Sequence, residues 1–121
     1  MSRSARQHLR VEIVTGITIV AVVDTDLLAE DVIQEVGEQL LQLLDEQGTD
    51  KLLINFRDVR FMSSAMVAQL VKLHRKIVKV NGKLKLCGFN PTIREVFRIS
   101  NLDRLLDIYD DEQLALDRFS K

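Results

Sequence analysis

A short and almost uninterrupted apolar run limits the folds open to this chain more than any other feature. Residues 51–56 read Lys-Leu-Leu-Ile-Asn-Phe, and patterns typical of amphipathic helices precede and follow this run. A strand that is apolar at consecutive positions has to be covered on both faces, as in the centre of a parallel sheet. The sequence therefore predicts a sheet with helices packed on it.

Strand and helix patterns alternate along the rest of the chain. Thr15-Gly16 lies between two β-rich runs and predicts a hairpin, which makes the sheet mixed. We expect further strands over residues 83–87 and 107–109, and helices over residues 30–47, 64–80, from 91 onward and after 111. The predicted class is α/β, a single domain with a mixed, mostly parallel sheet of about five strands and about four helices. Residues 1–9 are expected to be a flexible N-terminal segment and residues 10–121 the folded domain.

Composition argues against several kinds of function. The formal net charge of -1 gives no electrostatic reason to bind nucleic acid or an acidic membrane. No apolar run approaches the length of a membrane span, and the first ten residues lack the apolar centre of a signal peptide. Cys87 is the only cysteine, which excludes an internal disulfide and fits a reducing compartment. We expect a cytoplasmic protein that contacts neither nucleic acid nor a membrane.

Catalytic and metal-binding patterns are weak. His8 and His74 are isolated and have no spacing typical of nucleophilic catalysis or of a zinc site. Asp24 and Asp26 follow a predicted strand, as the acidic cluster of a response-regulator receiver would, but no aspartate ends the third strand, and a turn explains the pair better. Residues 48–51 lack the glycine spacing of a phosphate-binding loop. The sequence therefore predicts no enzyme, no metal and no cofactor.

Two serines open the helix that follows the central strand. A hydroxyl at a helix N-terminus lies among unpaired backbone N–H groups and the positive end of the helix dipole, so a phosphate there would be stabilised. Ser63 and Ser64 are therefore candidates for a phosphorylation switch, although serine also favours this position as an ordinary cap. Met62 and Met66 are candidates either for an exposed interface or for filling gaps in the core.

Four segments together resemble the STAS domain of bacterial anti-sigma-factor antagonists. They are Leu-Leu-Ile-Asn-Phe at 52–56, Val-Arg-Phe-Met-Ser-Ser-Ala-Met-Val at 59–67, Gly-Lys-Leu-Lys-Leu-Cys-Gly at 82–88, and Val-Phe-Arg-Ile-Ser-Asn-Leu at 96–102. The resemblance covers about residues 11–119 and implies a STAS-like fold over nearly the whole chain.

The resemblance also implies roles for particular residues. In that family the loop before the second helix reads approximately Phe-Met-Asp-Ser-Ser-Gly-Leu, and a partner kinase phosphorylates the serine after the aspartate. Alignment on Phe-Met places Ser64 at the phosphoacceptor, Ser63 at the aspartate and Met66 at the glycine. The loop that holds Asp24 and Asp26 lies near the phosphorylation loop in the family. The implied partner-binding residues are Asp24, Asp26, Met62 and Met66.

The function implied by this resemblance is that of an anti-sigma-factor antagonist. Such a module sequesters an anti-sigma factor, which is also the serine kinase, while Ser64 is unphosphorylated, and a phosphatase restores that state. The alternative is a STAS scaffold or adaptor that is not phosphorylated, as in stress-sensing assemblies or as the soluble subunit of a lipid-transport complex. The sequence leaves the oligomeric state open.

Overall fold

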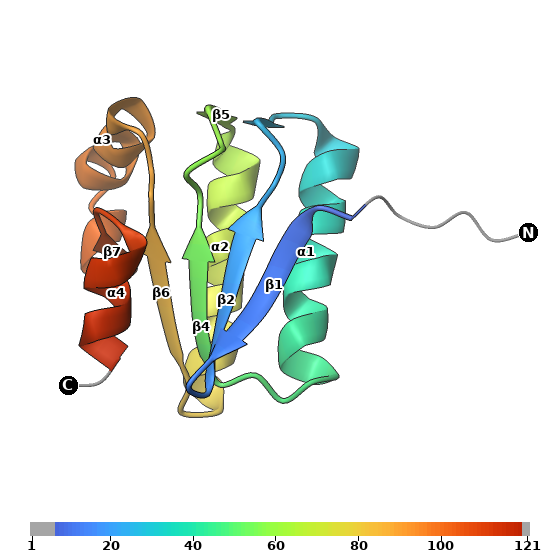
Figure 1. The fold of residues 1–121 in the computed structure, drawn as a ribbon. Coiled ribbons are helices and arrows are strands. Elements are labelled where there is room, and N and C mark those ends of the chain that lie inside the picture. Colours follow the sequence, from blue (N-terminus) through green and yellow to red (C-terminus); the bar gives the residue numbers. More distant parts are fainter. Residues whose placement is uncertain (1–6, 120–121) are drawn as a thin grey trace, which may run out of the picture.

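Five strands of the computed structural model, which describes residues 7–119, form one mixed sheet (Figure 1). They are β1 (Leu9–Val14), β2 (Ile17–Val22), β4 (Lys51–Asn55), β6 (Lys83–Cys87) and β7 (Asp107–Tyr109), and their spatial order is β1-β2-β4-β6-β7. β1 pairs antiparallel with β2, while the other pairings are parallel. The predicted mixed sheet, with residues 51–55 as its central strand, is confirmed.

Helices cover both faces of this sheet. They are α1 (Glu30–Asp45), α2 (Ser64–Lys79), α3 (Pro91–Ile99) and α4 (Glu112–Phe119), and a short 3-10 turn, η1 (Leu102–Arg104), follows α3. α1 and α2 lie side by side on one face, and α4 lies on the other (Figure 1). None of the helices within residues 7–119 is long and apolar enough to cross a membrane.

The coverage of both faces explains the apolar run of β4. Leu52 and Ile54 belong to the larger core beneath α1 and α2, whereas Leu53 belongs to a smaller core beneath α4. All three side chains are buried. Cys87 lies in the smaller core with Leu53, where burial, reinforced by nearby carboxylates, raises the pKa of its thiol to about 12.

Lys85 is a buried lysine on the face of β6 that α4 covers. Its Nζ lies 2.6 Å from Oδ2 of Asp107 and 3.3 Å from the hydroxyl of Tyr109. Burial alone would lower the pKa of Lys85, but these hydrogen bonds outweigh it and the pKa is raised. Residues 83–86 alternate lysine and leucine, but the strand does not have one face fully in solvent. Lys83 is exposed, whereas Lys85 is buried and paired with Asp107.

The folded domain begins earlier than residue 10. His8 and Leu9, expected in the flexible segment, are both buried. The ring of His8 lies between two carboxylates, with Nδ1 2.7 Å from Oδ1 of Asp24 and Nε2 2.7 Å from Oε1 of Glu35. These polar contacts join the chain ahead of β1 to the loop after β2 and to α1. The remainder of that expected segment, residues 1–6, lies outside the described residues.

Candidate functional site at the start of helix α2

Two loops at one rim of the sheet are held together by backbone hydrogen bonds. The short strands β3 (Asp26–Leu27) and β5 (Phe61–Met62) pair in parallel. Beside them the carbonyl oxygen of Thr25 accepts a hydrogen bond from the N–H of Arg60 at 2.7 Å. The loop after β2 is thereby fixed against the loop before α2, as the resemblance implies.

The N-cap of α2 is fixed to the same rim. The N–H of Ser63 donates to the carbonyl oxygen of Leu27 at 3.0 Å, and the carbonyl of Ser63 accepts from the N–H of Met66 at 3.1 Å. Ser63 has extended backbone angles (φ -87°, ψ 165°), as an N-cap requires. Its hydroxyl is shielded from solvent, however, and neither caps the helix nor finds another partner among the described residues.

Ser64 is the first residue of α2, and it is exposed. Backbone N–H groups in the first helical turn have no intrahelical partner, and they carry the positive end of the dipole. The first turn of α2 contains no acidic residue that would neutralise it. The position of Ser64 therefore favours an added anionic group.

An apolar groove of about 350 Å³ opens beside Ser64. One wall comes from the end of β5 and the start of α2, and the other from α3 and η1. The lining residues are Met62, Ser63, Ser64, Val67, Ile93, Val96, Ser100 and Leu102. α3 is well positioned for this because the side chain of Asn90 accepts from the N–H of Ile93 and Pro91 is the first helical residue. The groove can receive an apolar side chain of another molecule.

Further apolar side chains are exposed on the elements around the groove, and the sequence did not reveal their exposure. Val96 follows the helical apolar spacing of α3, yet it is 50% exposed, and Phe61 is 52% exposed. Leu28 and Ile99 are also exposed, the first directly after β3 and the second at the end of α3. Apolar residues at helical or strand spacing predict burial, so no sequence signal distinguishes these positions from the core.

Two of the four residues expected to bind a partner are buried. Met66 is completely inaccessible and packs in the larger core, so it cannot contact a docked protein. Asp24 is also buried, and it lies against His8. Both expectations are corrected, because the third position of α2 faces the sheet and because His8 holds the carboxylate of Asp24 inward. Asp26 is exposed, and Met62 is half-buried in the groove wall.

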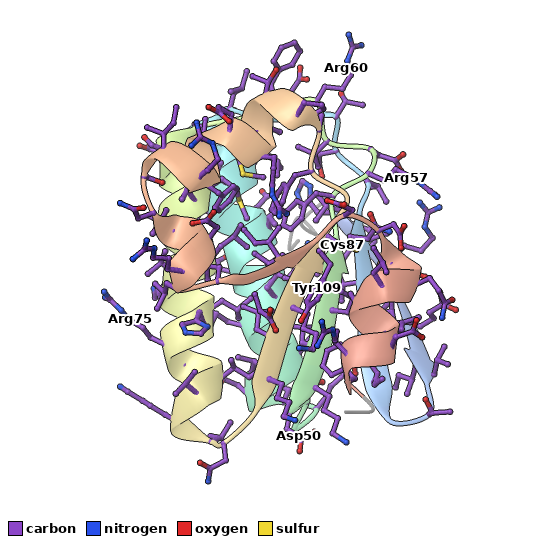
Figure 2. The ribbon with its side chains drawn as sticks, turned by 90° about the vertical axis from the view of Figure 1, so that its left-hand side faces the viewer. Asp50, Arg57, Arg60, Arg75, Cys87 and Tyr109 are labelled. Atoms are coloured by element: carbon purple, nitrogen blue, oxygen red, sulfur yellow. The ribbon has the colours of Figure 1, made fainter. Side chains whose placement is uncertain are left out.

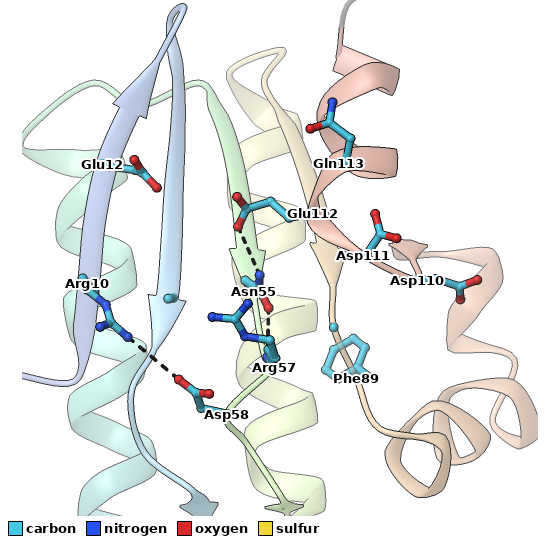
Figure 3. Close-up of a pocket in the computed structure, with 12 residues that line it drawn as sticks. Arg10, Glu12, Asn55, Arg57, Asp58, Phe89, Asp110, Asp111, Glu112 and Gln113 are labelled. Carbon is cyan, nitrogen blue, oxygen red and sulfur yellow. Dashed lines mark hydrogen bonds and ion pairs between the residues drawn. The ribbon is translucent and has the colours of Figure 1, made fainter.

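A larger and more polar cavity, about 730 Å³, lies where β4 and β6 end, next to the start of α4 (Figure 3). The side-chain amide of Asn55 donates to Oε1 of Glu112 at 3.1 Å, and its Oδ1 accepts from the N–H of Arg57 at 2.9 Å. An ion pair between Arg10 and Asp58 spans 3.8 Å. Within residues 7–119, no group of three or more His, Cys, Asp or Glu side chains is placed to hold a metal ion.

Comparison with known proteins assigns the family. The STAS domain model matches residues 8–115, nearly the whole chain. The chain belongs to the STAS domain family. This STAS protein is 22% identical over 78 residues to an anti-sigma F factor antagonist of Paenibacillus polymyxa, a match covering 64% of this chain and 67% of the relative.

Solved structures share the fold. An anti-sigma factor antagonist from Mycobacterium paratuberculosis superposes with a TM-score of 0.82 at 18% identity, covering 93% of each chain. The Bacillus cell fate determinant SpoIIAA in its phosphorylated form gives a TM-score of 0.69 at 22% identity, covering 92% of this chain and 98% of SpoIIAA. At such identities the likeness establishes the fold alone. The chain is a STAS protein similar to anti-sigma factor antagonists.

Proposed function

We propose that this STAS protein is an anti-sigma-factor antagonist that is switched by phosphorylation of Ser64. In the unmodified state its groove and rim bind an anti-sigma factor that is also a serine kinase, and a phosphatase reverses the modification. The observation that carries the proposal is the exposed first residue of α2, Ser64, on the edge of an apolar groove. Asp26 and Met62 belong to the same partner surface.

The phosphate would act on the complex and not on the fold. It adds about -1.5 to -2 charges and three acceptor oxygens at a helix N-terminus, which tolerates an anion. A partner that fills the groove covers Val67 and Val96, both of which line it. Enclosing the phosphate in that apolar contact costs desolvation energy, and the partner therefore dissociates.

No catalytic step is assigned to this chain, which would work in the cytoplasm without a cofactor. The chemistry belongs to the partner kinase, whose active site has to reach the Ser64 hydroxyl. Ser63, whose hydroxyl is shielded, is not an acceptor. The replacement of the family glycine by Met66 does not obstruct docking, because that side chain is buried.

The test begins with phosphorylation. The protein, its Ser64→Ala variant and its Ser63→Ala variant are incubated with ATP and a serine kinase of the anti-sigma type, and the added phosphate is located by mass spectrometry. We expect one phosphate on the wild type and on Ser63→Ala, and none on Ser64→Ala. Absence of phosphate on the wild type, while a control antagonist is labelled, would favour the scaffold or adaptor.

Binding measurements test the groove separately. Val96→Glu places a charge in the groove, whereas Val78→Glu places the same charge on α2 at a residue of similar exposure (52%) that does not line the groove. We expect Val96→Glu to abolish binding of the anti-sigma kinase and Val78→Glu to retain it. Equal binding by the two variants would exclude the groove as the docking site.

A further inference from the structure

β1 is an edge strand with no strand on its outer side in the described part of the chain. Within residues 7–119, β1 pairs only with β2, and it forms one border of the sheet (Figure 1). It contains six residues, whereas β7 at the opposite border contains three. An edge strand presents a row of unpaired backbone N–H and C=O groups that can pair with another strand.

The hairpin geometry shows which backbone groups face outward. Val14 and Ile17 flank the two-residue turn at Thr15 and Gly16, whose φ angles are both positive. In such a turn the two flanking residues, Val14 and Ile17, form a hydrogen-bonded pair. Because hydrogen-bonded and non-hydrogen-bonded pairs alternate along an antiparallel ladder, the N–H and C=O groups of the even-numbered residues of β1 point toward β2. The bond from the N–H of Val23 to the carbonyl of His8 continues this pattern.

The groups that face outward therefore belong to Leu9, Val11 and Ile13. Of these, the carbonyl of Leu9 accepts a hydrogen bond from the side-chain amide of Gln7, which a partner strand would displace. β1 carries the charged residues Arg10 and Glu12, but it lacks other features that usually protect an edge strand. It has no proline, no lysine and no bulge, and its register with β2 is continuous. The side chain of Ile13 is 68% exposed.

We propose that β1 pairs antiparallel with β1 of a second copy of this chain, about a two-fold axis at Val11. Val11 then faces Val11 of the other copy, and Leu9 faces Ile13. Because the N–H and C=O groups of these three residues face outward, these pairs are the hydrogen-bonded pairs between the two copies. The two sheets become one continuous sheet, and an isologous contact of this kind closes at two subunits.

The charges of β1 select this register. With the axis at Val11, Arg10 of each copy lies opposite Glu12 of the other, in a non-hydrogen-bonded pair where side chains approach most closely. If the two-fold axis is moved by one residue, to Arg10 or to Glu12, odd-numbered residues still pair with odd-numbered residues, so the backbone allows both of these neighbouring registers. These place Arg10 opposite Arg10, or Glu12 opposite Glu12. Like charges directly opposite each other destabilise a strand pair, so the register with its axis at Val11 is favoured over both of these neighbours.

The side of the contact that faces α1 also has room. Leu9 and Val11 line a groove of about 400 Å³ between β1 and α1, whose other lining residues are mostly polar and include Glu35, Glu38 and Gln42. Ile13 of the second copy would lie opposite Leu9 at this groove, beside Val11, which is 42% exposed in the single chain. Arg10 and Glu12 project on the opposite face of the sheet, where Figure 3 shows both at the border of the polar cavity.

Sedimentation equilibrium from micromolar to millimolar concentration tests the proposal. We expect the wild type to reach a dimer with no larger species. Arg10→Glu and Glu12→Arg each replace two attractive pairs with two repulsive ones, which should weaken the dimer by about thirty-fold. The double variant restores opposite charges and should recover the wild-type affinity. Arg75→Glu, on the exposed surface of α2 (Figure 2), controls for net charge.

A backbone variant gives an independent result. The N–H of Val11 faces away from β2, so Val11→Pro leaves the hairpin ladder intact but removes a donor from the dimer. We expect a folded monomer, checked by far-UV circular dichroism. The proposal is overturned by a wild type that stays monomeric at every concentration or forms open-ended oligomers. It is equally overturned if both single charge variants associate like the wild type, or if Val11→Pro still forms the dimer.

Discussion

The side chain of Asn90 joins the two walls of the groove, because its Nδ2 donates to the carbonyl oxygen of Arg60 at 3.0 Å. Its Oδ1 caps α3 by accepting from the N–H of Ile93 at 2.9 Å. One residue therefore sets the start of α3 and its position against the loop before α2. The shape of the groove depends on this residue although it does not line the groove.

Substitution of Asn90 should separate these two roles. Asn90→Ala removes both hydrogen bonds, and we expect the free energy of unfolding in urea to fall by about 1–2 kcal/mol. Asn90→Asp keeps an acceptor for the cap and loses only the donor to Arg60, so the fall should be smaller. Equal losses for the two variants would mean that the cap contributes nothing measurable.

Met66 should behave as a core residue. Met66→Gly restores the glycine of the family pattern, but it leaves a cavity beneath α2 and places glycine in a helix. We expect it to lower the free energy of unfolding by about 3–5 kcal/mol. Met66→Leu keeps the volume and should cost less than about 1.5 kcal/mol. A stable Met66→Gly protein with weaker partner binding would contradict the burial of this side chain.

A negative charge at Ser64 should stabilise the isolated protein. Ser64→Asp places a carboxylate at the start of α2, where the dipole is not neutralised, whereas Ser64→Asn is a neutral control of the same shape. We expect Ser64→Asp to be the more stable of the two by about 0.3–1 kcal/mol at low salt, and the difference should shrink as salt is added. Destabilisation by Ser64→Asp would show that the site does not tolerate an anion.

Cys87 should be unreactive in the folded state and should make stability depend on pH. Burial raises the pKa of its thiol from 9.0 to about 12, so thiol reagents at neutral to mildly alkaline pH should modify it only after unfolding. In the unfolded chain the Cys87 thiol ionises around the ordinary pKa of 9.0. Stability from this group is therefore complete below pH 9.0 and is lost as the pH rises toward about 12.

Cys87→Val provides the matched control for that pH dependence. Valine fills a similar buried volume and does not ionise, so the variant should show a smaller loss of stability between neutral and alkaline pH. The comparison is made from urea unfolding curves at several pH values. Identical pH profiles for the wild type and Cys87→Val would exclude a contribution from the thiol.

The order of the helices and of the strands of the main sheet was predictable because local patterns carry it, whereas the two-residue strands β3 and β5 were not predicted. Leu52, Leu53 and Ile54 are apolar at consecutive positions, which requires cover on both faces, and the structure has helices there. The start of α2 at Ser63 and Ser64 followed from capping preference and from the family resemblance. Spacing along one element was sufficient for these conclusions.

The surface of the site was decided by tertiary contacts. Met66 and Val96 are both apolar residues on amphipathic helices, yet one is buried and the other lines an open groove, because α3 ends beside α2 and leaves a gap. Asp24 is turned inward by His8, a residue sixteen positions away that sequence reasoning placed in a flexible segment. Hydrophobic periodicity determines which side of an element avoids water. Only the packing of distant segments determines which part of that side remains uncovered.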